Sequence, residues 1–276
     1  MKTLPKSNYK KAAEAIKNVA INTLFAEAVI EQKINGKIYV DNIEKPKTFY
    51  IIHPYGMTLL LGDSENNEFN NPFKDYALNI DNTRRKPEWM QAYPPTWDSV
   101  LSELFGDRLI ASSENKEQNL SGIIELNTRV NFKFDQDKFI ASRKPVMDND
   151  IKIVRTDGEV FQNMPGSVVP AYFWETEEDF LTKGVGFSLY YKNKLSSTAY
   201  SSCINASQLE LGIETVPEFR GKGFAQYVCQ ALIDYCIEHQ FEPVWACRLE
   251  NTGSYKLAKK VGFVPTIELP YYQFGN

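Results

Sequence analysis

Two glycines alternate with two basic residues at 220–223, Arg-Gly-Lys-Gly, between a strand-like and a helix-like segment. The residues before this turn, 208–216, predict a strand, and the residues after it, 223–240, predict an apolar helix. The first backbone N–H groups of a helix have no intrahelical partner and lie at the positive end of the helix dipole, so the turn can surround a phosphate. Gly223 allows the backbone to approach such an anion closely, and Lys222 adds a mobile positive charge.

The same turn does not match the two best-known phosphate-binding sequences. Gln226 stands where the dinucleotide fingerprint needs its last glycine, and no Ser or Thr follows Lys222 as a Walker A loop requires. Dinucleotide and ATP binding are therefore weak interpretations. For this segment taken alone, an ordinary turn between a strand and a helix remains the alternative.

Two segments taken together resemble the coenzyme-binding elements of the GNAT acyltransferase superfamily. The segment 220–225, Arg-x-x-Gly-x-Ala, is similar to its Q/R-x-x-G-x-G/A pyrophosphate motif. The segment 251–263, Asn-x-x-Ser-x-x-Leu-x-x-Lys-x-Gly-Phe, is similar to the next helix of that fold. The resemblance covers about residues 150–276 and implies a GNAT fold, a mixed and mostly antiparallel sheet flanked by helices, with acetyl-CoA as acyl donor.

The resemblance also implies which residues hold the coenzyme. The turn would bind the diphosphate, the end of the preceding strand would bind the pantetheine and polarise the thioester carbonyl, and the Asn-containing helix would contact the pantetheine arm. The implied contacts come from Ile213, Thr215, Arg220, Gly221, Lys222, Gly223, Phe224, Ala225, Gln226, Asn251 and Ser254. Helix capping alone would also explain Asn251.

Two carboxylates, Glu210 and Glu214, lie on the expected strand where GNAT enzymes often place a general base. An alkyl ammonium with a pKa near 10 cannot attack a thioester until it loses a proton. A carboxylate can accept that proton if partial burial raises its pKa toward neutrality. A bulge at Gly212 would turn either side chain inward. Glu210 is the first choice as base and Glu214 the second, and solvent-facing alternation is the alternative for both.

One position departs from the family pattern. Many GNAT enzymes carry a tyrosine in the Asn-containing helix that protonates the leaving thiolate, and alignment from Asn251 places Ala258 there. Tyr255 points elsewhere on the helix, so the acid stays open, with solvent as one candidate. We expect direct attack by the amine in a ternary complex, because no histidine is placed to activate Cys247 as a nucleophile.

Three functions are open. Segments 173–180, 212–215 and 245–247 are similar to a bacterial branch that includes zwittermicin-resistance acetyltransferases and has an extra N-terminal domain, and the Asn-x-x-Ser helix is shared with glycine N-acyltransferase-like proteins. The favoured function is transfer of an acetyl group from acetyl-CoA to an amine of a small-molecule acceptor. The alternatives are a CoA-binding regulatory protein without turnover, suggested by Ala258, and an acyltransferase for longer acyl chains or a non-amine acceptor.

Periodicity divides the chain into two parts of mixed α/β (α+β) structure. We place an N-terminal α+β domain of unknown role at 1–147 and the GNAT domain at 148–276, with the junction in the charged stretch 142–150. The first part predicts one amphipathic helix over 8–31, strands at 37–40, 48–52, 57–61 and 130–134, irregular structure over 66–95 and a helix at 96–105. The second predicts strands at 151–155, 186–191, 196–202, 208–216, 244–248 and 264–269 and helices within 160–183, 223–240 and 252–260. No internal repeat is visible.

Composition limits the partners. The net charge is −4 and the basic residues are scattered, which argues against nucleic acid. No signal-peptide core is present and the richest apolar segment, 19–30, is too short to span a bilayer, so we expect a cytoplasmic protein without a membrane partner. Cysteines at 203, 229, 236 and 247 show no pairing or metal-binding pattern, so we expect free thiols and no metal. The oligomeric state is open, with a homodimer as one option.

Overall fold

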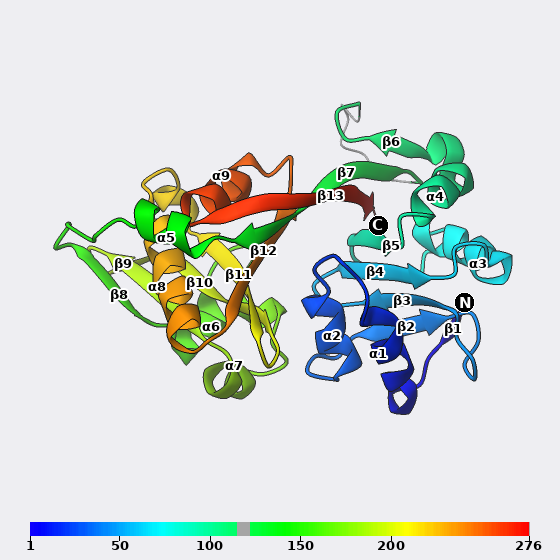
Figure 1. Cartoon of the computed structure of the whole chain (residues 1–276), viewed down its shortest axis with the longest axis horizontal. Coiled ribbons are helices and arrows are strands. Elements are labelled where there is room, and N and C mark those ends of the chain that lie inside the picture. Colours follow the sequence, from blue (N-terminus) through cyan, green and yellow to red (C-terminus); the bar gives the residue numbers. More distant parts are fainter. Residues whose placement is uncertain (115–121, 276) are drawn as a thin grey trace. The chain divides into compact units, whose positions relative to one another are not determined.

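The computed structural model describes residues 1–114 and 122–275 (Figure 1). It contains two compact units. The first consists of Met1–Val130, Arg248–Glu250 and Ile267–Asn276, and the second of Asn131–Cys247 and Asn251–Thr266. Two long strands, β7 (Ile124–Phe134) and β13 (Phe263–Phe274), contribute residues to both units. The boundary expected at residue 148 lies inside the second unit, and separate folding of 148–276 stays a prediction.

The first unit combines a sheet with helices. Its elements are β1 (Lys2–Thr3), η1 (Lys6–Asn8), α1 (Lys10–Ile16), α2 (Leu24–Ile30), β2 (Lys37–Val40), β3 (Thr48–Ile52), β4 (Met57–Gly62), α3 (Asn67–Ala77), β5 (Glu88–Tyr93), α4 (Trp97–Phe105), η2 (Gly106–Arg108) and β6 (Leu109–Ala111). The strand order is β1-β2-β3-β4-β5-β13-β7, with β6 beside β7. Strands β1 to β4 are antiparallel neighbours, whereas β4 and β5 are parallel.

Aromatic side chains of α3 and α4 build a core against this sheet. Phe73 of α3 meets Tyr50 of β3 edge-on, with ring centroids 5.0 Å apart, and stacks on Phe69 at 5.8 Å. Trp97 and Leu101 of α4 are fully buried in the same cluster. Burial of large rings is the main stabilising contribution of such a core.

The second unit carries the segment with the glycine turn. Its elements are α5 (Gln136–Ser142), β8 (Ile151–Arg155), α6 (Gly158–Asn163), η3 (Pro170–Tyr172), α7 (Glu177–Lys183), β9 (Gly186–Tyr191), β10 (Lys194–Ile204), β11 (Gln208–Thr215), η4 (Pro217–Phe219), α8 (Phe224–Glu238), β12 (Glu242–Arg248) and α9 (Thr252–Lys260). The strand order is β8-β9-β10-β11-β12-β7-β13. Strands β8 to β11 are antiparallel neighbours, and β11 and β12 are parallel.

Helices cover both faces of the sheet in the second unit. Helix α8 packs on β9, β10 and β11 (Figure 1), and Phe187 of β9 lies 6.4 Å from Tyr235 of α8 between ring centroids. On the other face, Tyr200 of β10 contacts Phe173, which follows η3, and Phe180 of α7. The mixed, mostly antiparallel sheet flanked by helices that the sequence predicted is confirmed.

The two units have the same topology. Apart from the 3-10 helices, α5 and the short strand β6, each unit has a first strand followed by two helices, three more antiparallel strands, a helix, a fifth strand parallel to the fourth, another helix and a long last strand. In each strand order, the fifth strand is not next to the long strand that follows it along the chain. The neighbour of β5 is β13, and the neighbour of β12 is β7. The chain is therefore an internal structural repeat, which was not visible in the sequence because shared topology does not require shared residues.

The helix predicted over 8–31 is wrong as a single element. It is two helices, α1 and α2, separated by residues 17–23. The Asn22 side chain accepts a hydrogen bond from the Leu24 amide at 3.1 Å, just before α2 begins. Asparagine competes in this way with the helical backbone and favours a new start over continuation.

The irregular structure predicted over 66–95 is also wrong, because this stretch contains α3 and β5. Its Asn and Pro content concealed the helical spacing of Phe69, Phe73 and Ala77, which form the buried face of α3. The remaining predicted strands and helices are present, but the strands predicted at 130–134 and 264–269 are the much longer β7 (Ile124–Phe134) and β13 (Phe263–Phe274).

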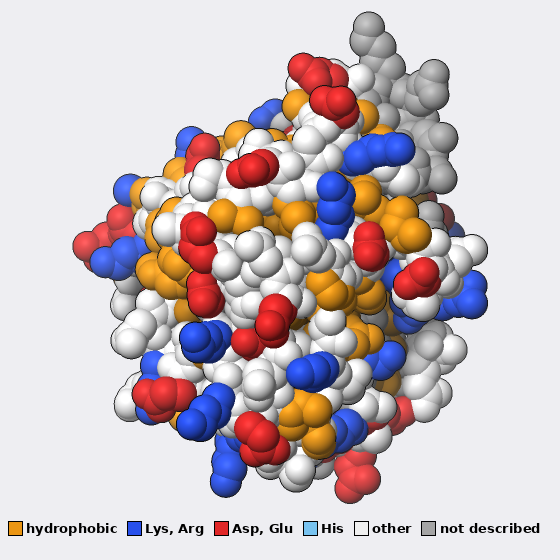
Figure 2. Space-filling model, turned by 90° about the vertical axis from the view of Figure 1, so that its right-hand side faces the viewer, with side chains coloured by type: hydrophobic (Ala, Val, Ile, Leu, Met, Phe, Trp, Pro, Cys, Tyr) orange, Lys and Arg blue, Asp and Glu red, His pale blue; other side chains and the backbone are white. Residues whose placement is uncertain are grey.

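Surface charge and helix length are relevant to nucleic acid and membrane as partners. On the face shown in Figure 2, basic and acidic side chains are interspersed among polar and apolar ones, without a stripe of one sign. Within residues 1–114 and 122–275, no helix has the length and apolar character needed to cross a bilayer.

Residues that precede the expected boundary belong to the core of the second unit. Phe139 of α5 is 1% exposed, and a Cβ on Gly262 would lie 2.7 Å from its Cβ. Gln230 of α8 exchanges two hydrogen bonds with the backbone of Lys144, at 3.3 and 3.0 Å. The segment 131–147 is therefore packed against the rest of the unit.

We expect Phe139→Ala to lower the free energy of unfolding of the second unit by about 3–5 kcal/mol, because it removes a buried ring and leaves a cavity. Ile140→Ala is the matched control, since Ile140 is the next residue and is 58% exposed; its effect should stay below about 1 kcal/mol. Denaturant unfolding followed by circular dichroism measures both changes. Equal and small effects would show that α5 is not part of this core.

Candidate coenzyme and acyl-transfer site

The turn between β11 and α8 has an open backbone. Gly221 and Gly223 have φ angles of +80° and +84°, in the left-handed region that favours glycine. A Cβ on either residue would meet no atom within 4 Å. Gly223 is the N-cap of α8 and no side chain caps this helix. The N–H groups of Phe224 and Ala225, the first two of α8, therefore lack both a helical and a side-chain acceptor, which makes this end attractive to an anion.

Aromatic packing holds the turn on the sheet. Phe224 is buried against Tyr191 of β9 and Phe219 of η4, with ring centroids 5.1 and 6.1 Å away. Lys222 places its Nζ 4.9 Å from the centre of the Phe219 ring, a cation–π contact. The turn is thus anchored by its aromatic neighbours, while Gly221 and Lys222 stay exposed.

Gln226 differs from the other residues of the turn. Its side-chain amide donates to the carbonyl oxygen of Ser142 at 3.4 Å. Its backbone N–H donates to the carbonyl oxygen of Gly223 at 3.1 Å. The side chain is buried. Gln226 therefore links α8 to the end of α5, and a coenzyme contact from it stays a prediction.

The parallel ladder between β11 and β12 ends early. Residues 208–210 pair with 242–244 and the ladder stops there, although β11 continues to Thr215 and β12 to Arg248. Beyond Glu210, the strand that includes Ile213 and Thr215 pairs with β10 on its other side. Divergence of two strands leaves backbone N–H and C=O groups that an extended ligand can use, as a peptide does at a sheet edge.

Helix α9 begins at an asparagine that caps it. The Asn251 Oδ1 accepts a hydrogen bond from the Ser254 amide at 3.1 Å. The Ser254 Oγ accepts one from the Trp245 Nε1 at 3.2 Å. The capping role weighed for Asn251 is therefore present, and contact of this exposed residue with pantetheine stays a prediction.

Both expected carboxylates face the side of the sheet opposite α8. Glu210, Gly212 and Glu214 share one face of β11 by alternation, and Gly212 pairs with Tyr200 of β10, whose ring packs against Phe173 and Phe180. Both glutamates are buried. The interpretation of solvent-facing alternation is therefore wrong, because α6, η3 and α7 cover this face.

The bulge considered at Gly212 lies on the neighbouring strand. The register shifts between Ser201 and Cys203 of β10, and Glu210 is opposite Cys203. A glycine at position 212 is explained by the Tyr200 ring instead, since a Cβ there would lie 2.5 Å from a ring atom. The expectation of a bulge at Gly212 is corrected accordingly, and both carboxylates reach one face without it.

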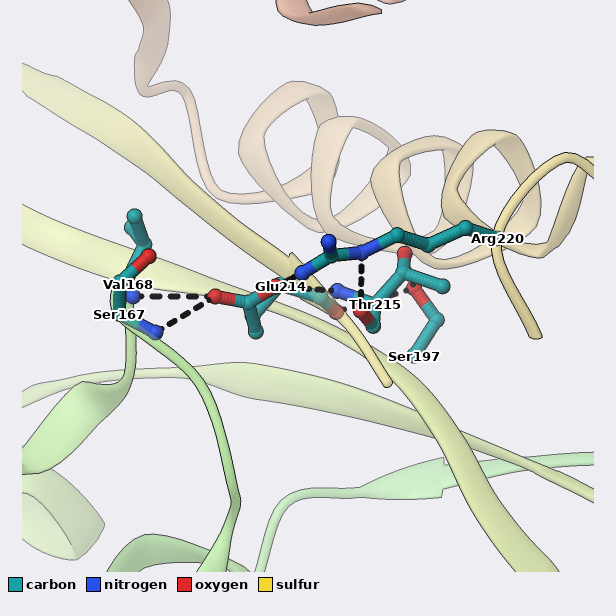
Figure 3. Close-up of polar contacts among 6 residues, drawn as sticks. All are labelled: Ser167, Val168, Ser197, Glu214, Thr215 and Arg220. Atoms are coloured by element: carbon teal, nitrogen blue, oxygen red, sulfur yellow. Dashed lines mark hydrogen bonds and ion pairs between the residues drawn. The ribbon is translucent and has the colours of Figure 1, made fainter. Parts of the chain in front are cut away.

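The Glu214 carboxylate is surrounded by N–H donors (Figure 3). Its Oε2 accepts hydrogen bonds from the amides of Ser167 and Val168 at 2.9 and 3.1 Å. Its Oε1 accepts from the Thr215 amide at 3.1 Å and from Nη2 of Arg220 at 3.2 Å. A base must offer a lone pair to the incoming proton, whereas this carboxylate is already engaged by four donors. These four contacts argue against Glu214 as the base, and its catalytic role stays a prediction.

The contacts with Ser167 and Val168 were missed from the sequence. These residues lie between α6 and η3, in a stretch predicted as helical segments. The available signal was the Pro165-Gly166-Ser167 sequence, which is typical of a turn. Its partner could not be inferred, because Glu214 lies 47 residues after Ser167.

Helix α9 does not supply an obvious acid for the leaving thiolate. Ala258 is fully buried, so this position faces the interior of the unit. Tyr255 lies against Phe132, with ring centroids 5.5 Å apart. Solvent remains the candidate proton donor.

The corresponding elements of the first unit lack both the uncapped helix start and the diverging strands. Helix α3 follows β4 as α8 follows β11, but Asn66 caps α3 with its side chain, which accepts from the Phe69 amide at 3.3 Å. The preceding connection and first turn carry Asp63, Glu65 and Glu68, whose negative charges disfavour a phosphate. The β4–β5 ladder runs unbroken over 57–61 and 89–93. Only the second unit therefore combines an open turn with diverging strands among the described residues.

Comparisons with known proteins agree with this fold. The family model described as GNAT acetyltransferase matches residues 14–272, and the chain belongs to this family. It is 26% identical over 254 residues to the uncharacterized N-acetyltransferase YdfB of Bacillus subtilis (strain 168), covering 91% of this chain and 90% of that protein. The chain is therefore a GNAT-family acetyltransferase. The match includes the first unit, beyond the 150–276 that the sequence resemblance covered.

Solved structures share the fold over the whole chain. A GCN5-related N-acetyltransferase-like protein from Streptococcus suis 89/1591 has a TM-score of 0.70 at 18% identity, covering 98% of this chain and 99% of that one. A tandem GNAT protein from the clavulanic acid biosynthesis pathway has a TM-score of 0.61 at 11% identity, covering 99% and 97%.

The four cysteines are free and buried. Cys229 and Cys236 lie on the inner side of α8, where burial raises the pKa of the Cys229 thiol well above its usual range and that of Cys236 to about 12. Both behave as small apolar core side chains, as the sequence indicated.

We expect Cys229 and Cys236 of the native protein to react slowly with Ellman's reagent near neutral pH. The thiolate is the reacting species, so a raised pKa and burial both slow the reaction. The same protein in guanidinium chloride should release the full complement of four thiols, which serves as the control. Fast labelling of either residue in the folded protein, identified by mass spectrometry, would contradict this packing.

Proposed function

We propose that the second unit transfers an acetyl group from acetyl-CoA to an amine of a small-molecule acceptor, by direct attack in a ternary complex. The observation that carries the proposal is the open, uncapped turn at 220–225 beside the divergence of β11 and β12. An anion-binding helix start next to a strand that has no ladder partner on its β12 side suits a ligand with a diphosphate at one end and a long amide-containing arm. Acetyl-CoA, the acyl donor of the GNAT family, has this form.

In this proposal the donor is held mainly by backbone groups. The N–H groups around Gly221, Gly223 and Ala225 bind the diphosphate, with Arg220 and Lys222 adding charge. The pantetheine lies along β11 beyond its last ladder pair. Further contacts come from Ile213, Thr215, Phe224, Gln226, Asn251 and Ser254.

The acceptor amine approaches on the face of β11 that carries Glu210. Glu210 accepts a proton from the ammonium, and the freed amine forms a bond with the acetyl carbon. Backbone N–H groups near Ile213 and Thr215 stabilise the oxyanion. The C–S bond then breaks, the nitrogen loses a second proton to solvent as the neutral amide forms, and the CoA thiolate takes a proton from solvent, since Ala258 has no acidic group. Glu214 is kept as the second candidate base, with its engaged carboxylate as the argument against that role.

We also propose that the first unit does not bind the coenzyme. A diphosphate needs free N–H groups at the start of a helix, but the Asn66 side chain already accepts from one of those of α3. Three nearby carboxylates would also repel the negative charge of a diphosphate. The complete β4–β5 ladder leaves no strand opening for pantetheine.

Thiol release from acetyl-CoA with a panel of primary amines tests the function, with products identified by mass spectrometry. We expect acetylation of at least one amine. Tight CoA binding without product from any amine would instead support a regulatory protein, and turnover only with longer acyl-CoA donors would support an acyltransferase of different donor range.

We expect Gly223→Val to weaken CoA binding about tenfold or more. A β-branched side chain is strained at φ +84° and projects into the open space of the turn. Gly106→Val is the matched control, because Gly106 also has a positive φ and open space around it but lies after α4 in the first unit. Titration calorimetry on both folded variants measures the difference. Unchanged affinity in Gly223→Val would remove the assignment of the turn.

We expect Glu210→Gln to lower kcat about a hundredfold near neutral pH, with little change in the acetyl-CoA KM. Higher pH should restore part of the loss, because an ammonium with a pKa near 10 then supplies more free amine. Glu242→Gln, the same change at an exposed position of β12, is the control and should keep full activity. Full activity of Glu210→Gln at neutral pH would show that the proton leaves by another route.

A further inference from the structure

A short loop between α6 and η3 is tied to the end of β11. The amides of Ser167 and Val168 both donate to Oε2 of Glu214. Gly166 has a φ of +147°, and a Cβ there would lie 2.4–2.6 Å from side-chain atoms of Glu214. Residues 165–167 are exposed. The carboxylate thus holds a solvent-exposed loop against a buried strand, and glycine at 166 permits the close approach.

The same carboxylate also reaches the turn proposed for the coenzyme. Oε1 of Glu214 accepts from Nη2 of Arg220 at 3.2 Å, and Nε of Arg220 donates to the carbonyl oxygen of Thr215 at 3.1 Å. The Glu214 side chain is 7% exposed whereas that of Arg220 is 60% exposed. An ion pair with so exposed a partner is weak by itself. A guanidinium has five N–H donors, so those not used here can bind a phosphate.

We propose that Glu214 is a positioning residue that couples the coenzyme turn to the loop at 165–168. This inference rests on the proposed function, since it takes 220–225 as the diphosphate site. A diphosphate bound to Arg220 immobilises the guanidinium and makes its pair with Glu214 persistent. The carboxylate is then held in place to accept from Ser167 and Val168.

Coenzyme binding therefore orders a loop beside the face of β11 that carries Glu210. An acceptor that contacts this loop then meets a site whose ordering cost has already been met. The coupling is reciprocal, so an acceptor that contacts the ordered loop also tightens CoA binding.

Hydrogen–deuterium exchange at Ser167 and Val168, resolved by mass spectrometry with and without CoA, tests the coupling. In the wild-type protein we expect CoA to slow exchange at these two amides about fivefold or more, the lower end of typical coupling between sites. Calorimetry on the same samples establishes CoA binding independently.

Two variants test the Arg220–Glu214 contact and the contact of Glu214 with the loop separately. Each variant is measured at a CoA concentration that saturates it. Arg220→Gln should keep the protection seen without ligand, because the amides still donate to Glu214, but should lose the response to CoA. Glu214→Gln should exchange faster without ligand, because it loses the charge and one acceptor oxygen, and should not respond to CoA. Glu218→Gln, an exposed acid in η4, is the matched control and should behave as the wild type.

The outcomes distinguish this inference from the function beneath it. Absence of CoA binding to the wild type would overturn both. CoA binding with unchanged exchange at Ser167 and Val168, or an undiminished response in Arg220→Gln, would overturn the coupling alone. A hundredfold loss of kcat in Glu214→Gln that higher pH restores, with unchanged loop exchange, would make Glu214 the base and also overturn the coupling.

Discussion

The coenzyme site proposed in the second unit depends on the first turn of α8, whose first backbone N–H groups need an acceptor from outside the helix. The N–H groups of Phe224 and Ala225 have no acceptor within the helix, and no side chain caps them. Gly221 and Gly223 adopt the left-handed conformation that keeps the turn open. The ladder between β11 and β12 also stops short of this end of β11. Together these features place a positive helix end beside a strand that has no ladder partner on its β12 side, and the proposed coenzyme site depends on both.

The internal repeat shows that topology alone does not make such a site. The first unit has the same order of helices and strands, yet Asn66 caps α3 and the β4–β5 ladder is complete. The difference lies in a few residues at the strand-to-helix connection, glycines and basic residues in one unit and acidic residues with an asparagine cap in the other. Function is thus determined by the residues placed on the fold rather than by the fold itself.

The sequence was informative where chemistry depends on local backbone requirements. The turn at 220–223 was predictable, because only glycine adopts its φ angles without strain and because the helix that follows has a clear apolar pattern. Helix α3 was not predicted, because Asn and Pro obscured the spacing of Phe69 and Phe73. The four donors around Glu214 could not be predicted, since two of them come from a loop more than 40 residues earlier in the chain. The repeat escaped notice for a related reason, because its halves share strand order rather than residues.

A crystal structure of the chain with CoA tests the central claim most directly. We expect the diphosphate oxygens within hydrogen-bond distance of the backbone N–H groups at 221–225, and the pantetheine along β11 beyond Glu210. A diphosphate bound at the start of α3, or remote from the start of α8, would contradict the assignment of the coenzyme site to the second unit.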